Sequence, residues 1–190
     1  MPEKGATMAK PLAPEGYNTV NPFIITQDAL AVIDFLREVF GGEELEAAHT
    51  VDDDGLLLHA EVRIGDSIVM LADRKPDWPY TPSLLQVYVD DLDETLARAR
   101  RLGARVVTEP TGFFGATMSR VLDPWGNLWW IYRQDPDAAW SEAEWSAAAQ
   151  ADSTSEKTGD EWGGGTDPGL TYIHDTLLEA MRNLRSPRDS

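Results

Sequence analysis

The sequence predicts an α+β fold in which two βαβββ modules form a curled mixed sheet around a cleft, followed by a C-terminal extension. One observation is an internal repeat, because a strand, a helix and three strands over residues 17–74 recur over residues 83–134. Asp28 at the first helix start corresponds to Asp91 at the second, about sixty residues later, and a repeat of this length indicates repeated modules. The second observation is composition. A chain of 190 residues with 42% hydrophobic side chains can bury a core that two small modules share.

The elements of the first module follow from its hydrophobic pattern. Residues 19–25 are β-branched and aromatic, as strands are, and residues 28–40 carry an apolar stripe at helical spacing. This stripe consists of Leu30, Ile33, Leu36, Val39 and Phe40. The Asp-Asp-Asp-Gly run at 52–55 predicts a solvated hairpin tip, and residues 65–67 predict a turn. The remaining strands are expected at residues 44–51, 56–64 and 68–72.

The second module repeats this order after a Pro-rich bridge. Residues 84–89 alternate as a strand does, Asp91 and Glu94 form a capping-box-like helix start, and Gly103 is suited to end that helix. The apolar positions of the helix are Leu92, Leu96, Ala99 and Leu102. Three further strands are expected at residues 105–109, 118–122 and 127–132. Turns are expected at Thr111–Gly112, at Gly115 and over residues 123–126.

Both ends of the chain differ in character from the modules. We expect residues 1–16 to be a disordered leader before a domain over 17–134. Residues 135–170 are acidic and of low complexity, and predict a linker. Residues 171–185 predict a docking helix, in which His174 faces solvent. Its apolar stripe consists of Ile173, Leu177, Leu178, Met181 and Leu184.

Composition also excludes several classes of partner. The net charge of −17 and the pI near 4.4 argue against nucleic acid, whose binding uses clustered Lys and Arg. No apolar run is long enough to cross a membrane, and the N-terminus lacks a signal-peptide pattern. The absence of cysteine excludes disulfides and thiolate chemistry. We therefore expect a soluble, cytoplasmic protein.

Four segments resemble the glyoxalase, bleomycin-resistance and extradiol-dioxygenase superfamily, also called vicinal-oxygen-chelate proteins. They are residues 35–41 (FLREVFG), 59–67 (HAEVRIGDS), 89–93 (VDDLD) and 120–127 (RVLDPWGN). The segment at 59–67 is most similar to the PhnB-like branch. The resemblance implies two modules whose strands curl around a ligand cleft, with the helices on the outer face. It also implies a homodimer, which would protect the open sheet edges.

The resemblance also gives positions for a metal, namely Asn21, Met70, Leu84 and Trp130. Catalytic divalent metals need imidazole or carboxylate donors, which Met, Leu and Trp do not offer. We therefore expect no metal at the usual position and no cofactor. His49, His59 and Glu61 are the alternative set for a divalent metal.

Strand alternation assigns side chains to the two faces of the sheet. If Trp130 faces the cleft, Trp129 and Ile131 face a helix, and the cleft-facing partners are Leu128, Tyr132, Leu84, Gln86, Tyr88, Leu57, His59, Glu61 and Arg63. The candidate ligand-binding residues are Trp130, Tyr132, Tyr88, Gln86, Phe113, Phe114 and Arg120. The aromatic members suit a flat ligand. For Arg120, which precedes the Asp-Pro turn, we expect a structural salt bridge.

Three functions remain open. The first is binding or sequestration of an aromatic or cationic small molecule, such as an antibiotic, without chemistry. The second is a glyoxalase-like lyase or isomerase, or a dioxygenase-type enzyme, in which His59 and Glu61 act as acid and base, with or without a metal. The third is a scaffold that docks on a protein partner through the C-terminal tail. Pattern alone leaves the ligand, the dimer geometry and the role of the C-terminal extension open.

Overall fold

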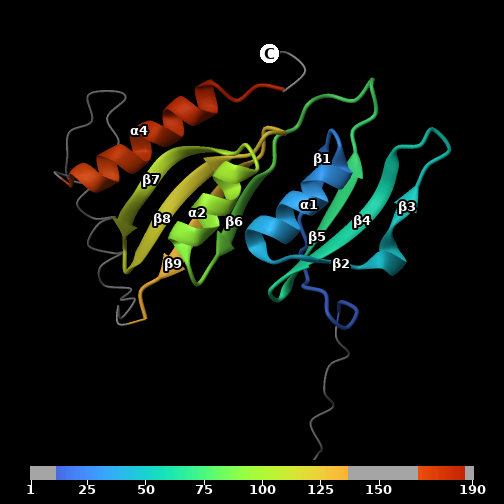
Figure 1. The fold of residues 1–190 in the computed structure, drawn as a ribbon, viewed down its shortest axis with the longest axis horizontal. Coiled ribbons are helices and arrows are strands. Elements are labelled where there is room, and N and C mark those ends of the chain that lie inside the picture. The colour runs from blue at the N-terminus through green and yellow to red at the C-terminus, as the bar shows by residue number, and fades with distance from the viewer. Residues whose placement is uncertain (1–11, 137–166, 187–190) are drawn as a thin grey trace, which may run out of the picture.

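The computed structural model describes residues 12–136 and 167–186 and contains two sheets and three α-helices (Figure 1). Its elements in chain order are β1 (Phe23–Thr26), α1 (Ala29–Phe40), β2 (Glu43–Glu44), a 3-10 turn (Glu46–Ala48), β3 (Thr50–Val51), β4 (Leu57–Ile64), β5 (Ser67–Asp73), β6 (Leu84–Tyr88), α2 (Leu92–Arg101), β7 (Arg105–Phe113), β8 (Ala116–Leu122), β9 (Leu128–Gln134) and α4 (Pro168–Arg182). This order confirms the α+β fold with two βαβββ modules.

The two modules have the same sheet topology. The first sheet has the order β1-β5-β4-β2, with β3 also paired to β4, and the second has the order β6-β9-β8-β7. In each module the first strand runs parallel to the last, and the other pairs are antiparallel. Because β1 and β6 are the corresponding edge strands, the repeat in the sequence is a repeat of topology.

Both helices of the modules pack on one side of the sheets and share a core. Figure 1 shows α1 and α2 next to each other in the middle of the molecule, and the two helices are in contact. Buried Phe35 and Leu36 of α1, Leu96 of α2 and Trp129 of β9 belong to one hydrophobic cluster. We call the opposite side of the sheets the cleft face, because it carries most of the side chains that the sequence assigns to the cleft.

Several details differ from the pattern-based expectations. Leu30 is 52% exposed, so the buried stripe of α1 is carried instead by Ala29, Val32, Ile33, Phe35, Leu36 and Val39. The expected strand at 44–51 is broken by the 3-10 turn, and Val20 lies outside β1 and is 82% exposed. β7 continues through Thr111–Gly112, because a shift in its register against β8 absorbs the irregular residues. The chain turns at Phe114 and Gly115, which both have positive φ.

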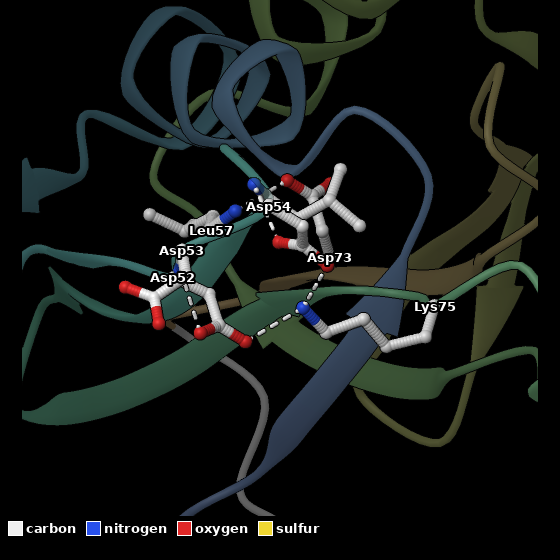
Figure 2. A network of polar contacts seen from close by, with 7 residues as sticks. Asp52, Asp53, Asp54, Leu57, Asp73 and Lys75 are labelled. Atoms are coloured by element: carbon white, nitrogen blue, oxygen red, sulfur yellow. Dashed lines mark hydrogen bonds and ion pairs between the residues drawn. The ribbon is translucent and has the colours of Figure 1, made fainter.

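The hairpin tip at 52–55 is tied to the bridge between the modules, which is more than the solvated tip that we expected (Figure 2). Lys75 Nζ lies 2.7 Å from Asp52 Oδ2 and 2.5 Å from Asp54 Oδ2. Hydrogen bonds from Lys75 hold the pKa of both carboxyls below the usual value. Asp73 fixes the same corner by accepting from the backbone N–H groups of Ala29 and Leu57, both at 2.8 Å.

The last described residues return to the bridge and to the 123–126 turn. Tyr80 donates a hydrogen bond to the carbonyl of Gly126 at 2.8 Å, and Arg74 donates to Ser186 at 3.4 Å. A Cβ at Gly126 would lie 2.3 Å from the Tyr80 hydroxyl and 3.2 Å from the Arg185 carbonyl, and Gly126 has φ +89°. The turn therefore requires glycine at this position.

The C-terminal helix exists, but it begins and ends three residues earlier than predicted. Its buried residues are Ile173 and Ala180, whereas Met181 of the expected stripe is 41% exposed and His174 is half-buried. Most of the predicted leader and linker lies outside the described residues, so the domain boundaries stay predictions. Among the described residues, no helix has the length and apolar composition to cross a membrane.

Candidate functional site

The faces of β9 follow the alternation that the sequence predicts. Trp129 and Ile131 are 2% and 0% exposed and belong to the core, whereas Trp130 and Tyr132 lie on the cleft face and are half-buried. On β6, Leu84 and Tyr88 are 50% and 64% exposed on the cleft face. The β9 and β6 residues that the sequence assigns to the cleft are therefore on that face, except that Leu128 is fully buried there.

β4 departs from the alternation at one end. Leu57 is 2% exposed and belongs to the core, and Leu58 is 49% exposed, so the expected faces of these two residues are wrong. A register irregularity between β3 and β4 lies at this point and reverses the side-chain directions. His59, Glu61 and Arg63 keep the expected face opposite core residues Ala60 and Val62.

Aromatic side chains gather along β6, β9 and the β7–β8 turn. We call Tyr88, Tyr132, Phe113 and Phe114 the aromatic wall. Its ring centroids are 5.5 Å apart for Tyr88 and Tyr132, 6.1 Å for Tyr132 and Phe113, and 4.8 Å for Phe113 and Phe114. Gln86 donates a hydrogen bond to the Tyr88 hydroxyl at 2.8 Å, so an amide lies beside the exposed end of the wall. This arrangement brings five of the seven predicted ligand residues together.

The other two predicted ligand residues, Arg120 and Trp130, form a pair next to the wall. The Arg120 guanidinium carbon lies 5.2 Å from the centroid of the Trp130 ring, within the range of a cation–π interaction. Among the described residues no carboxylate forms an ion pair with Arg120, so the expected salt bridge is not found in this part of the chain. Its burial lowers the pKa of Arg120 below the usual value.

Helix α4 covers the Arg120 side of this face. Arg120 Nη1 donates to the Ile173 carbonyl at 2.7 Å, and the hydroxyls of Thr176 and Thr108 are 2.8 Å apart. Figure 1 shows α4 along β7 at the edge of the second sheet. Thr108 and Arg120 are paired residues of β7 and β8, and Arg120 is paired with Trp130 of β9, so the helix lies on the cleft face.

A hydrogen-bonded set of titratable groups occupies the cleft face of the first sheet. Glu61 accepts from the Tyr17 hydroxyl at 2.5 Å through Oε2, and its Oε1 lies 3.1 Å from His59 Nε2. Burial alone raises the pKa of Glu61, but the hydrogen bonds from Tyr17 and His59 outweigh it and hold that pKa below the usual value. Glu61 is therefore a buried carboxylate between a phenol and an imidazole, and this set can accept or donate a proton.

Sequence reasoning missed Tyr17, because it lies in a segment that was expected to precede the first strand. It also missed Trp78 in the bridge, which is 44% exposed. Trp78 lines a hollow of about 420 Å³ between the edge strands β1 and β6, together with Phe23 and Leu84. The Phe23 ring lies 5.9 Å from the His59 ring, so this hollow adjoins the Glu61 set.

At two of the positions where the resemblance places metal ligands, Leu84 is exposed and Trp130 lies beneath Arg120. Neither side chain offers a donor atom for a divalent metal. The alternative metal set is not assembled. His49 Nδ1 lies 2.6 Å from Glu44 Oε1, and no cluster of three His, Asp or Glu that could hold a metal occurs among residues 12–136 and 167–186. The donor set of the cleft face therefore does not fit a divalent metal.

Comparisons with known proteins agree with this fold. Uncharacterized protein Rv0887c of Mycobacterium tuberculosis (strain ATCC 25618 / H37Rv) is 29% identical over 162 residues, covering 79% of this chain and 92% of that protein. The crystal structure of protein PA1353 from Pseudomonas aeruginosa is 20% identical with a TM-score of 0.51, covering 60% of this chain and 96% of that one. A glyoxalase/bleomycin resistance protein/dioxygenase family enzyme from Burkholderia phytofirmans PsJN is also 20% identical with a TM-score of 0.51, covering 63% and 97%.

One family model matches residues 16–131, which contain every helix and strand of the two modules apart from the end of β9. The match spans more than half of the chain, and the two-module topology agrees with it. The chain belongs to the Glyoxalase/Bleomycin resistance protein/Dioxygenase superfamily.

Proposed function

We propose that this protein binds an aromatic small molecule on the cleft face of its second sheet. The observation that carries the proposal is the aromatic wall, whose outermost member, Tyr88, is 64% exposed. Neighbouring Leu84 and Phe23 are 50% and 46% exposed, so the apolar surface continues toward the first sheet. An exposed aromatic surface with an amide at its edge suits a flat ligand that stacks and accepts or donates one hydrogen bond.

If the aromatic wall binds the ligand, removing one of its rings should lower the affinity for that ligand. A thermal-shift screen of aromatic metabolites and antibiotics should find a ligand that raises the melting temperature, since binding to the native state stabilises it. Tyr88→Ala should lower the affinity for that ligand about three- to tenfold, because one stacked ring is lost. Calorimetric titration measures the change.

Leu30→Ala is the matched control, because Leu30 is an exposed apolar residue of α1, away from the cleft face. It should leave the affinity unchanged. Equal effects of the two substitutions, or a screen without any aromatic ligand, would contradict the proposal.

The set formed by Tyr17, Glu61 and His59 favours a second candidate, a metal-free enzyme that moves a proton on a carbon next to a carbonyl. Glu61 is 6% exposed and ionised, and it contacts both partners. A carboxylate held between a phenol and an imidazole has the parts of an acid–base pair. The hollow lined by Phe23 lies beside this set and offers space for a small substrate.

Solvent deuterium exchange tests the second candidate. Incubation with α-hydroxy ketones in D₂O should label the substrate carbon, and Glu61→Gln should remove at least about 99% of that labelling, as the loss of an acid–base catalyst does. Mass spectrometry of the ketones gives the result. Tyr17→Phe is a milder companion that keeps the carboxylate and should retain part of the rate. Labelling no faster than in buffer would contradict this candidate.

The other finer expectations are proposals as well. The homodimer, the PhnB-like branch and the cytoplasmic location rest on the resemblance and the composition. The docked helix argues against the scaffold function, because its buried residues Ile173 and Ala180 already pack on the chain's own second sheet.

A further inference from the structure

Arg120 is a buried cation that lacks an anionic partner within the described part of the chain. The residue is 4% exposed, and none of the ion pairs among residues 12–136 and 167–186 involves it. Nη1 donates to Thr108 Oγ1 at 3.2 Å and to the Ile173 carbonyl at 2.7 Å, whereas buried Nε has no acceptor among the described residues. A buried charge without a counter-charge lowers the stability of the folded protein. Stabilisation of the fold therefore does not explain why an arginine is buried here.

The position of Arg120 connects it to the aromatic wall. Thr108, Arg120, Trp130 and Gln86 form one row of paired residues across β7, β8, β9 and β6. Tyr132 lies two residues from Trp130 on the same face. Burial raises the pKa of Tyr132, and the positive charge of Arg120 acts on that hydroxyl in the opposite direction. The guanidinium is therefore at the inner end of the surface on which an aromatic ring would stack.

We propose that Arg120 anchors the carboxylate of an aromatic carboxylic acid, and that the Ile173 carbonyl of α4 occupies the carboxylate's place in the empty protein. The inference rests on the proposed function, because the aromatic wall holds the ring of the same ligand. One guanidinium matches one singly charged carboxylate in charge and in geometry. A phosphate would bring a second charge that the site does not neutralise. The net charge of −17 repels anions at long range, so a local cation is required to hold one.

Arg120 is only 4% exposed, so a ligand cannot reach its guanidinium in this conformation. Helix α4 must therefore move when the anion binds. The attachment of α4 is small. Its backbone packs against β7, Arg120 of β8 reaches it through one side-chain hydrogen bond, and of its 15 residues only Ile173 and Ala180 are buried. The carbonyl of Ile173 is a neutral acceptor, and a carboxylate forms the stronger hydrogen bond to a guanidinium.

Two matched probes test the anchor, 2-naphthoate and its neutral analogue naphthalene-2-carboxamide. The full-length protein should bind the naphthoate at least about tenfold more tightly, as expected for a hydrogen bond between charged groups. Arg120→Met should reduce this preference to about onefold and keep the melting temperature, since it removes an uncompensated buried charge. The control Arg133→Met, at an exposed arginine of β9, should retain the preference.

A disulfide tests the movement of α4 without changing Arg120. The chain has no cysteine, and a Cβ at Gly169 would lie 3.4 Å from Thr111 Cγ2, so the pair Gly169→Cys and Thr111→Cys can join α4 to β7. The oxidised double variant should bind 2-naphthoate at least about tenfold more weakly than the same protein after reduction, which restores the charged contact. Binding of the carboxamide should be the same in both states.

The outcomes separate the two proposals. If neither probe binds the native protein, the proposed function fails, and the anchor fails with it. If both probes bind equally well, or Arg120→Met retains the preference, the wall stands and the anchor is wrong. If the oxidised and reduced double variants bind the naphthoate equally, α4 does not cover the anion site. Should Arg120→Met not fold, the comparison of oxidised with reduced protein still decides.

Discussion

Trp129→Ala should lower the free energy of unfolding by about 3–5 kcal/mol, the usual cost of truncating a buried Trp. Trp129 is 2% exposed in the core, and its ring centroid lies 4.9 Å from that of Phe40 in the helix of the other module. The substitution therefore leaves a cavity where the two modules meet. A cost of this size approaches the whole stability of an ordinary domain. Urea unfolding followed by circular dichroism measures the change.

Trp78→Ala is the matched control, because it removes the same side chain from a position that is 44% exposed in the bridge. It should cost far less than Trp129→Ala. Trp130→Ala should also cost less, because its ring lies on the half-buried cleft face, although it supports Arg120. A similar loss of stability for Trp78→Ala and Trp129→Ala would show that the core does not depend on the face of β9.

Asp123→Ala should cost about 3 kcal/mol or more, because it leaves several buried donors without an acceptor. Asp123 is 3% exposed at the start of the 123–126 turn. Its Oδ1 accepts from the backbone N–H groups of Trp125 and Asn127, and its Oδ2 accepts from the Asn127 amide and the Trp129 indole, all within 3.0 Å. Chemical denaturation of this variant beside the wild type checks the expected loss.

Asp123→Asn is the companion variant, since it retains one acceptor oxygen and should cost less than Asp123→Ala. Burial raises the pKa of Asp123 despite these four hydrogen bonds. The folded state therefore binds this proton more tightly than the unfolded state. The resulting stabilisation is present in acid and is lost as the pH rises through the raised folded value. Asp123→Asn should remove this part of the pH dependence, and an unchanged pH profile would contradict the assignment.

The repeat and the periodicity predicted most of the fold, and the departures have local causes. Alternation assigned β9 and β6 correctly because their pairing is regular from Leu84–Leu128 to Tyr88–Tyr132. Alternation failed at Leu57, where the pairing of β3 and β4 is irregular. The turn expected at Thr111–Gly112 was wrong for a similar reason, because β7 continues there with a shift in register. A hydrophobic pattern reports which side chains are buried, but not where a strand gains an extra residue.

The site could be predicted only in part. Two positions on one strand face placed His59 beside Glu61, and the structure has them 3.1 Å apart. The third member of the set, Tyr17, comes from a segment without regular structure, and no local pattern encodes a contact over 44 residues. An amphipathic stripe likewise predicted that the terminal segment docks as a helix. It contains no information about which face of which sheet receives the helix.

The contact between the last described residues and the bridge has a consequence for the order in which the chain can fold. Ser186 contacts Arg74 across 112 residues, and Thr176 contacts Thr108 across 68. Contacts this distant in sequence require closure of long loops, and α4 has no surface to dock on until β7 and β8 have paired. During synthesis from the N-terminus, both modules leave the ribosome before α4 does. The cleft face of the second sheet is thus open before α4 covers it, so Arg120 is exposed to solvent during that interval.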